Sequence, residues 1–369
     1  IANYYVVEDG GEGLPVGSIG AEAFKDLPGS ISEVIIPDSV TVFGDAAFSN
    51  SGLTRIVLPE QLTAIPANCF RNADNLEKVV FRSGGALRSI GDYAFYGADA
   101  LKLDVLYLTT DYEGKNVSED PTRSLPEGLT TIGQSAFQNA TAVTVVRFPS
   151  TITTISRNAF VGTELKFVVT SSDYITLGDG VFKGAADAFR VFVPNVLTYS
   201  GMGWESLSGR IFDKDDISGD WAYTTQSGSN LITVVQYLGN DSEVTVSDTL
   251  DGKSVAAIGD NAFGRGVTKV TFCSGTLITD RTFAAAKDLR EIAIVRTGDF
   301  YAENGAALVS AFQSGLTGLD TLGFIDPDRP VSSILDGLTL PNTVRIVKIE
   351  NTGTNLAEIP EGFLSGATA

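Results

Sequence analysis

Histidine is absent from this 369-residue chain, and its absence limits the chemistry that the side chains can do. Without histidine the chain cannot build a Ser-His-Asp triad, a Cys-His nucleophile pair or a His-ligated zinc site. Two carboxylates at a set separation would still suffice for glycoside hydrolysis. The chain has 45 Asp and Glu residues, however, so close pairs arise by chance and solvated acids are the ordinary interpretation. GxSxG, Walker and HExxH motifs are also missing, and we predict that the protein is not an enzyme.

Two stretches are candidates for holding a metal ion or a phosphate. Asp213, Asp215 and Asp216 form an acidic run whose oxygens can ligate calcium. Glycine is missing from the position that an EF-hand calcium loop requires, so a solvated acidic linker is the favoured interpretation and calcium the alternative. The glycine-rich stretch 178–184 coincides with one copy of an internal repeat. We therefore expect no metal ion and no cofactor.

A short repeated unit must position any site that the protein has. The unit is a large apolar residue, often followed by Gly, with a Phe five positions later. Nine copies keep this spacing, and they end at Phe24, Phe48, Phe70, Phe95, Phe137, Phe160, Phe182, Phe263 and Phe283. Successive phenylalanines are mostly 20 to 25 residues apart, with one step of 42 and one of 81. This period is typical of a solenoid coil.

The residue types around the Phe predict the shape of one coil. The residue before the Phe is small in most copies, with Cys69 in the place of an alanine, as expected for a helical turn packed on its neighbour. Asn or Gly two positions after the Phe tolerates a positive φ and can end that turn. A strand follows, often closed by a proline, which lacks an amide donor; its clearest copies span 31–36, 53–58, 143–148 and 188–193. Stacking such coils predicts a solenoid of mainly parallel β-strands with short helical turns.

The Ile-Gly-x-x-Ala-Phe and Leu-x-x-Ile-x-Leu-Pro units resemble those of the BspA-type leucine-rich repeat family. The resemblance covers residues 13–300 and is looser beyond them. It implies a leucine-rich-repeat solenoid. Related proteins include bacterial surface adhesins, so the resemblance also implies display outside the cell and adhesion to other macromolecules.

The step of 81 residues predicts two arrays. Tyr199, Trp204 and Phe212 resemble the aromatic segment that closes arrays in this family. We therefore predict a first array over residues 1–212 with a C-terminal aromatic cap, and a second array over residues 213–369.

The second array is expected to begin with a β-rich cap at residues 221–246 and to become irregular after about residue 296. Its last unit, Ile359 to Phe363, is one residue shorter than the others. Either the native protein continues beyond Ala369 or an atypical coil seals the end, because an uncapped solenoid exposes its core.

One position of the strand pattern should point away from the core. In the first array the apolar residues at this position are Ile35, Val57, Val80, Tyr107, Val169 and Phe192, with Arg147 between them. Stacked coils would align these residues into a ladder, and a contiguous apolar patch on a soluble protein often marks a binding site. Two alternatives remain open: β-branched residues favour strands in general, and loops can cover this face.

The step of 42 residues contains a second candidate site. Residues 109–127 are polar and poor in strand signals, as expected of an insertion that loops out of the solenoid. Loops carry function disproportionately, and Tyr112 and Asn116 are the candidate binding residues here. A degenerate coil is the alternative.

The formal charge of −19 repels phosphate backbones and anionic lipids, so neither nucleic acid nor a membrane surface is an expected partner. No apolar run approaches the roughly 20 residues that span a bilayer. We predict a secreted or cell-surface bacterial protein that mediates protein–protein interaction or adhesion to host or bacterial macromolecules. The alternative is a glycan-binding accessory protein for polysaccharide use, for which exposed Trp and Tyr platforms would be the signature.

Overall fold

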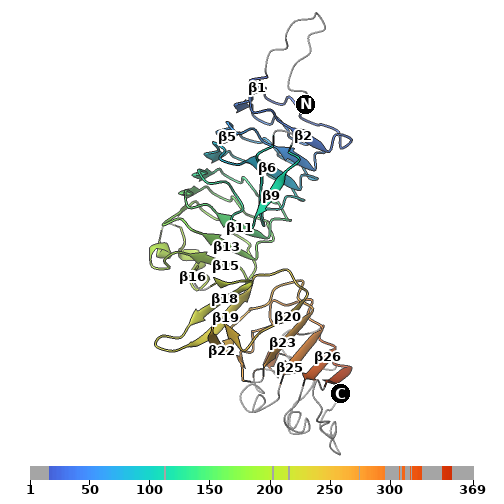
Figure 1. The fold of residues 1–369 in the computed structure, drawn as a ribbon, viewed down its shortest axis with the longest axis vertical. Coiled ribbons are helices and arrows are strands. Elements are labelled where there is room, and N and C mark those ends of the chain that lie inside the picture. The colour runs from blue at the N-terminus through green and yellow to red at the C-terminus, as the bar shows by residue number, and fades with distance from the viewer. Residues whose placement is uncertain are drawn as a thin grey trace, which may run out of the picture. The chain divides into compact units, whose positions relative to one another are not determined.

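A computed structural model describes residues 16–111, 114–201, 203–214, 217–273, 275–295, 318–325 and 343–350, together with 307, 310, 311 and 316. The chain forms two compact units, Ile1–Asp215 and Asp216–Ala369, and each is described by itself. Within the described ranges both units are built from short, mainly parallel strands with almost no helix (Figure 1).

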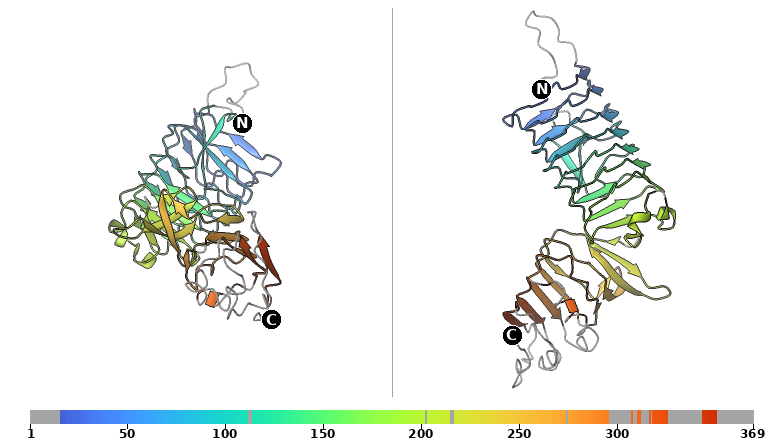
Figure 2. Two further views of the ribbon diagram at one scale, coloured as in Figure 1. Left: turned by 60° about the horizontal axis from the view of Figure 1, so that its bottom comes forward. Right: turned by 180° about the vertical axis from the view of Figure 1, so that it is seen from behind.

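The first unit is a solenoid whose coils supply strands to two sheets, which are parallel except where β9 pairs with β8 (Figures 1 and 2). The sheet with longer strands has two parts: β2 (Glu33–Ile35), β4 (Arg55–Val57), β6 (Lys78–Arg82), β8 (Leu106–Thr109) and β9 (Val117–Asp120); then β11 (Val145–Phe148), β13 (Phe167–Thr170), β15 (Arg190–Val193) and β16 (Ile211–Asp213). The other sheet has two-residue strands: β1 (Ser18–Ile19) with β3 (Val42–Phe43), then β5 (Ala64–Ile65), β7 (Ser89–Ile90), β10 (Thr131–Ile132), β12 (Thr154–Ile155) and β14 (Thr176–Leu177). The predicted solenoid of parallel strands is confirmed.

The phenylalanines of the repeat form a continuous stack through the core of the first unit. From Phe24 to Phe182, neighbouring ring centroids lie 5.0 to 5.8 Å apart, with interplanar angles of 4° to 17°. The pair Phe95 and Phe137, separated by the longest sequence step, is spaced at 5.2 Å like the others. The additional residues of that step therefore leave the stack undisturbed.

The predicted helical turns around each Phe are instead reverse turns that pair with the next coil. In the coil of Phe48, the amides of residues 46, 48 and 50 donate to the carbonyl oxygens of residues 67, 69 and 71 at 3.0, 2.8 and 2.8 Å. Positive φ angles at Ala46 (55°) and Asn50 (53°) direct these amides along the solenoid axis, whereas an α-helix would keep them within its own turn. The expected positive φ two residues after the Phe is confirmed at Asn50, Asn72, Gly97, Asn139, Gly162 and Gly184.

The glycine of the Ile-Gly pair allows the backbones of stacked coils to approach closely. A Cβ atom on Gly44, Gly91, Gly133 or Gly178 would lie 2.3 to 2.8 Å from a backbone atom of the preceding coil. Gly20, in the first described coil, would meet nothing within 4 Å. A side chain at one of these four glycines would force two coils apart.

An aromatic segment packs on the last coil of the first unit. It contains two 3₁₀ turns, η1 (Thr198–Ser200) and η2 (Glu205–Leu207). Tyr199 donates its hydroxyl to the Ser172 carbonyl at 2.8 Å, and Trp204 donates its indole N–H to the Ile175 carbonyl at 2.6 Å. Burial raises the pKa of the Tyr199 phenol to about 12. Both side chains are almost completely buried and complete the core at this end.

The second unit has two sheets around a separate core. The first contains β17 (Ile217–Ser218), β18 (Trp221–Thr225), β19 (Leu231–Tyr237), β22 (Lys253–Ile258), β21 (Thr249–Leu250) and β24 (Leu277–Ile278). The second is parallel and contains β20 (Glu243–Thr245), β23 (Lys269–Cys273), β25 (Glu291–Val295), β26 (Thr321–Ile325) and β27 (Ile346–Glu350). Most of the irregular stretch after residue 296 and the short unit at 359–363 lie outside the described residues.

Candidate functional site

The ladder residues align in two rows on the outward side of the longer-stranded sheet. Strand pairing places Ile35, Val57, Val80 and Tyr107 in one register, and it places Arg147, Val169 and Phe192 in another. Val57, Val80 and Tyr107 form a cluster separate from the main core, packed against Ile35, Val105 and Val117. Their direction is therefore the predicted one.

The expectation that the ladder is exposed is wrong for most of its members. Val57 and Val80 are fully buried, and Tyr107 and Phe192 are 6% and 1% exposed. Ile35 and Val169 are half-buried. Loops covering this face, one of the two alternatives, account for Val57, Val80 and Tyr107.

The covering element is a hairpin formed by β8 and β9, which pair antiparallel through Tyr107 and Glu119. Its turn folds back over earlier coils, where Arg55 donates from Nη2 to the Gly114 carbonyl at 3.1 Å and Arg82 donates to the Asp111 carbonyl. Gly114 has a φ of 69°, and a Cβ there would lie 3.0 Å from Val57 Cγ2. The two candidate sites are therefore connected, because the insertion covers the part of the ladder that contains Val57 and Val80.

The insertion differs from the expected strand-poor loop because Val117–Asp120 form strand β9. Tyr112 lies outside the described residues. Asn116, Ser118 and Glu119 are exposed on the hairpin. The structure places these polar groups on the outer side of the element that buries Val57 and Val80.

Phe192 is buried by a different arrangement. Its ring packs edge-on against Phe167 at 6.3 Å and tilted against Phe212 at 6.0 Å. The Arg147 guanidinium lies 5.3 Å from the centre of the Phe167 ring, a cation–π distance. Neighbouring aromatic side chains therefore enclose this end of the ladder.

Charged groups surround the hairpin. The Arg82 side chain is only 4% exposed and its Nε lies 3.2 Å from Asp38 Oδ1, and Arg55 pairs with Glu33. Desolvation, together with the nearby carboxylates of Asp104, Glu119 and Glu77, raises the pKa of Tyr107. A hydrogen bond from the Thr122 hydroxyl holds the pKa of the Asp120 carboxyl below its ordinary value. The exposed charges on the described part of the hairpin are therefore one acid, Glu119, and one base, Lys115, and its turn is held from below by arginines.

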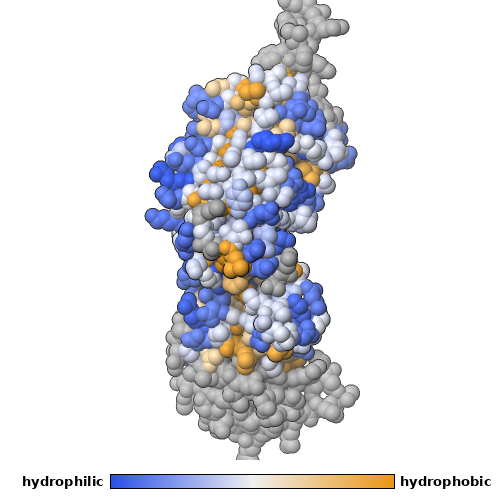
Figure 3. All heavy atoms as spheres, turned by 90° about the vertical axis from the view of Figure 1, so that its left-hand side faces the viewer, coloured by the Kyte–Doolittle hydropathy of each residue, from blue (hydrophilic) through white to orange (hydrophobic). Residues whose placement is uncertain are grey.

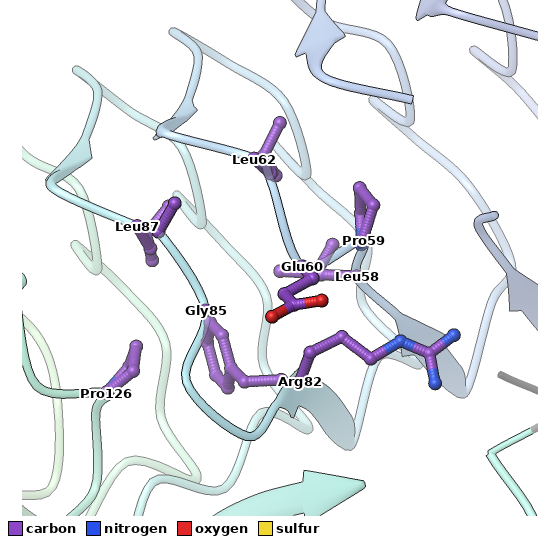
Figure 4. Close-up of a pocket in the computed structure, with 10 residues that line it drawn as sticks. Leu58, Pro59, Glu60, Leu62, Arg82, Gly85, Leu87 and Pro126 are labelled. Carbon is purple, nitrogen blue, oxygen red and sulfur yellow. The ribbon is translucent and has the colours of Figure 1, made fainter. Parts of the chain in front are cut away.

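A shallow hollow lies beside Arg82, one of the two arginines that anchor the hairpin (Figure 4). Its walls are Leu58, Pro59, Glu60, Leu62, Phe81, Arg82, Gly85, Ala86, Leu87 and Pro126. Figure 4 shows the Glu60 carboxylate in the hollow, while the Arg82 guanidinium points away from it. One carboxylate in an apolar hollow is not a pair of acids, so this site does not supply the arrangement that glycoside hydrolysis needs.

The described residues contain no group of three His, Cys, Asp or Glu side chains that could hold a metal ion. Of the calcium candidates, Asp213 ends strand β16, and Asp215 and Asp216 lie outside the described residues. Cys69 is buried in the core, where desolvation raises the pKa of its thiol well above the ordinary value. None of the helices in the described ranges is long and apolar enough to cross a bilayer.

Solved structures of other leucine-rich repeat proteins resemble this chain. A leucine-rich cell surface protein from Faecalibacterium prausnitzii is 17% identical, with 88% of each chain covered and a TM-score of 0.32. The pneumococcal vaccine antigen PcpA is 17% identical over 96% of this chain and 78% of its own, with a TM-score of 0.32. A leucine-rich repeat protein from Bacteroides ovatus is 17% identical over 94% of this chain and 82% of its own, with a TM-score of 0.33. No curated protein matches the chain.

A family model describes the repeats of the first unit. The BspA type leucine-rich repeat region matches in six copies over residues 15–111 and 118–203. The gap between the two ranges falls in the turn of the β8–β9 hairpin. The resemblance drawn from the sequence beyond residue 213 lies outside the matched ranges. With these repeats and this solenoid, the first unit of the chain belongs to the BspA-type leucine-rich repeat family.

Proposed function

We propose that this chain is displayed on a bacterial surface, where it binds a protein ligand through the β8–β9 hairpin of its first unit. Leucine-rich repeat surface proteins bind other proteins or mediate adhesion, and the membership of the first unit in the family supports the same general role. The observation that carries the finer proposal is the hairpin, which departs from the regular stacking of the first unit and is anchored on a rigid sheet by Arg55 and Arg82. An irregular loop on a rigid scaffold is a common place for a binding surface.

The charged and apolar residues around the hairpin indicate which kind of protein surface would bind there. Glu119 and Asn116 are exposed on the hairpin, and Glu77 and Asp104 act electrostatically on Tyr107 in its strand β8. The half-buried Ile35 lies next to the covered part of the ladder, and the half-buried Val169 lies in the other row; each offers a small apolar contact. A basic protein surface would complement this face, since complementary charges steer association and fix orientation. Figure 3 shows the first unit from the left-hand side of Figure 1, and there its surface is mostly white or blue with scattered orange residues.

The first experiment compares purified chain on arrays of matrix and bacterial surface proteins with arrays of glycans. Binding to one or more proteins at micromolar or tighter affinity supports the proposal. Binding to sugars alone would overturn it.

The second experiment places the ligand on the hairpin. The double variant N116K/E119K should weaken binding of a captured protein at least about tenfold, because it replaces an acidic contact with two cations. The matched control Glu164→Lys reverses an exposed charge elsewhere in the first unit and should bind like the wild type. Equal affinity of the double variant and the control would remove the hairpin from the interface.

A further inference from the structure

A second cluster of ordered side chains lies on the turns that carry the phenylalanine stack. It consists of Arg71, Tyr93, Tyr96, Gln134 and Asn139, and we call it the tyrosine platform. These residues come from three successive coils, those of Phe70, Phe95 and Phe137. Asn139 is exposed and the other four side chains are half-buried, so all five reach the surface.

The platform is held in one arrangement by contacts among its own members. The rings of Tyr93 and Tyr96 lie 5.9 Å apart at 54°, and the Arg71 guanidinium carbon lies 5.4 and 4.8 Å from their centres. Each phenol accepts an amide hydrogen bond: Gln134 Nε2 donates to Tyr93 at 2.9 Å, and Asn139 Nδ2 donates to Tyr96 at 3.3 Å. Planar groups fixed in this way lose little freedom when a ligand binds.

Tyr93 occupies a backbone position that disfavours it. Its φ is 55°, in the left-handed region, where a bulky side chain is an outlier. The same position, two residues before the Phe, has positive φ in other coils as well, where its residues are not aromatic: Glu22, Ala46, Asn68, Ser135, Asn158, Gly180 and Asn261. The turn thus admits residues of several sizes at this position, and a half-buried aromatic ring in the left-handed region points to a binding role for Tyr93.

We propose that the tyrosine platform binds a neutral saccharide chain. The tilted aromatic rings offer π-faces to sugar C–H groups, and the amides and guanidinium offer planar donors and acceptors to sugar hydroxyls. Arg71 Nη1 donates a hydrogen bond to Asn68 Oδ1 at 3.1 Å. A guanidinium has five N–H donors, so others can face a ligand. The rise between coils, about 4.8 Å, is close to the length of one pyranose ring. The chain charge of −19 favours a neutral glycan over an anionic one.

Tyrosine rather than tryptophan forms this platform. Trp204 is 1% exposed and seals the end of the first unit, and Trp221 packs on the core of the second. The expected glycan signature was exposed Trp and Tyr platforms, and the site proposed here uses its tyrosine part. This site is separate from the hairpin and does not depend on the protein ligand proposed for it.

The test is calorimetric titration of the whole chain with neutral hexasaccharides of glucose, mannose and N-acetylglucosamine, alongside sialylated and sulfated oligosaccharides. We expect binding to at least one neutral chain, and Tyr96→Ala should weaken it at least about tenfold through the loss of one stacking surface. Tyr174→Ala removes a single tyrosine that is 49% exposed, and Lys183→Ala changes the register position of Tyr96 in a later coil. Both controls should bind like the wild type.

Tyr93→Asn separates a binding role from a structural one. Asn68 and Asn158 occupy the same register with φ of 55° and 58°, so asparagine fits this backbone. We expect the thermal midpoint to stay the same or to rise by about 2 °C, while saccharide binding falls about tenfold. A lower midpoint with unchanged binding would make Tyr93 a packing residue and overturn the proposal. Binding to none of the sugars, or to anionic ones only, would overturn it as well.

Discussion

Replacing Val80 by aspartate tests whether the hairpin truly covers the ladder. Val80 is fully buried under the hairpin, whereas Val169, in the other row of the ladder, is half-buried. A carboxylate at position 80 would lose its water unless the hairpin lifts away. Keeping it buried and unpaired costs several kcal/mol.

The free energy needed to lift the hairpin is the upper limit of the stability that Val80→Asp can lose. It breaks the bonds from Arg55 to Gly114 and from Arg82 to Asp111, each contributing about 2 kcal/mol as bonds from charged donors. It also exposes Val57 and Tyr107 to water. We expect Val80→Asp to lower the free energy of unfolding by about 3–5 kcal/mol, Val80→Ala by about 2 kcal/mol, and Val169→Asp by about 1 kcal/mol.

Urea denaturation measures these losses, and deuterium exchange locates them. In Val80→Asp the amides of residues 106–120 should exchange faster, because the β8–β9 pairing is released, while exchange in Val169→Asp stays near that of the wild type. Equal losses in the two aspartate variants, with unchanged exchange over residues 106–120, would show that Val80 faces solvent and that our account of the hairpin is wrong.

Two further predictions concern the stacking and the end of the first unit. Gly133→Ala should lower the free energy of unfolding by about 3 kcal/mol, because its Cβ would lie 2.5 Å from a backbone atom of the preceding coil. At Gly20 an added Cβ would meet nothing within 4 Å, so Gly20→Ala should stay within about 0.5 kcal/mol of the wild type. Urea denaturation measures both changes. Tyr199 has a folded-state pKa raised from 10.0 to about 12, so the stability it contributes is complete below pH 10 and is lost as the pH rises through 12. Tyr199→Phe should therefore lose less stability than the wild type between these pH values, and a parallel decline of the two proteins would contradict the assignment.

The repeat pattern was sufficient to predict the solenoid because its signals are local and repeated. The spacing of the phenylalanines predicted which residues stack, and Asn or Gly two positions later predicted the positive φ that the structure has at Asn72 and Gly97. The turns themselves were predicted as helical from their small residues and short length. Hydrogen bonds to the next coil, such as the one from Phe70 to Ala94 at 2.7 Å, favour reverse turns instead, and a single coil contains no sign of them.

The burial of the ladder could not be predicted from the alternation of apolar and polar residues along the strands. Alternation indicates to which side of a sheet Val57 points, but not which segment lies over it. The covering contact joins Arg55 to Gly114, which are 59 residues apart. Strand β9 has the sequence Val-Ser-Glu-Asp, in which only the valine is a residue type that favours strands. Its side chains therefore do not indicate a strand. The 42-residue step indicated an insertion but not the direction in which it folds.

The step from Phe95 to Phe137 also bears on how such a protein can acquire new parts. Closing a loop of 42 residues instead of about 23 between stacked rings costs only about 0.5 kcal/mol of additional chain entropy. Thr130 still reaches the carbonyl of Arg88 across that interval, at 3.0 Å, as Thr153 reaches Thr130 at 3.2 Å in a regular coil. The chain entropy of closure therefore sets almost no limit on the length of the segment between two coils, and variation between relatives should concentrate at this junction while the phenylalanine stack stays the same.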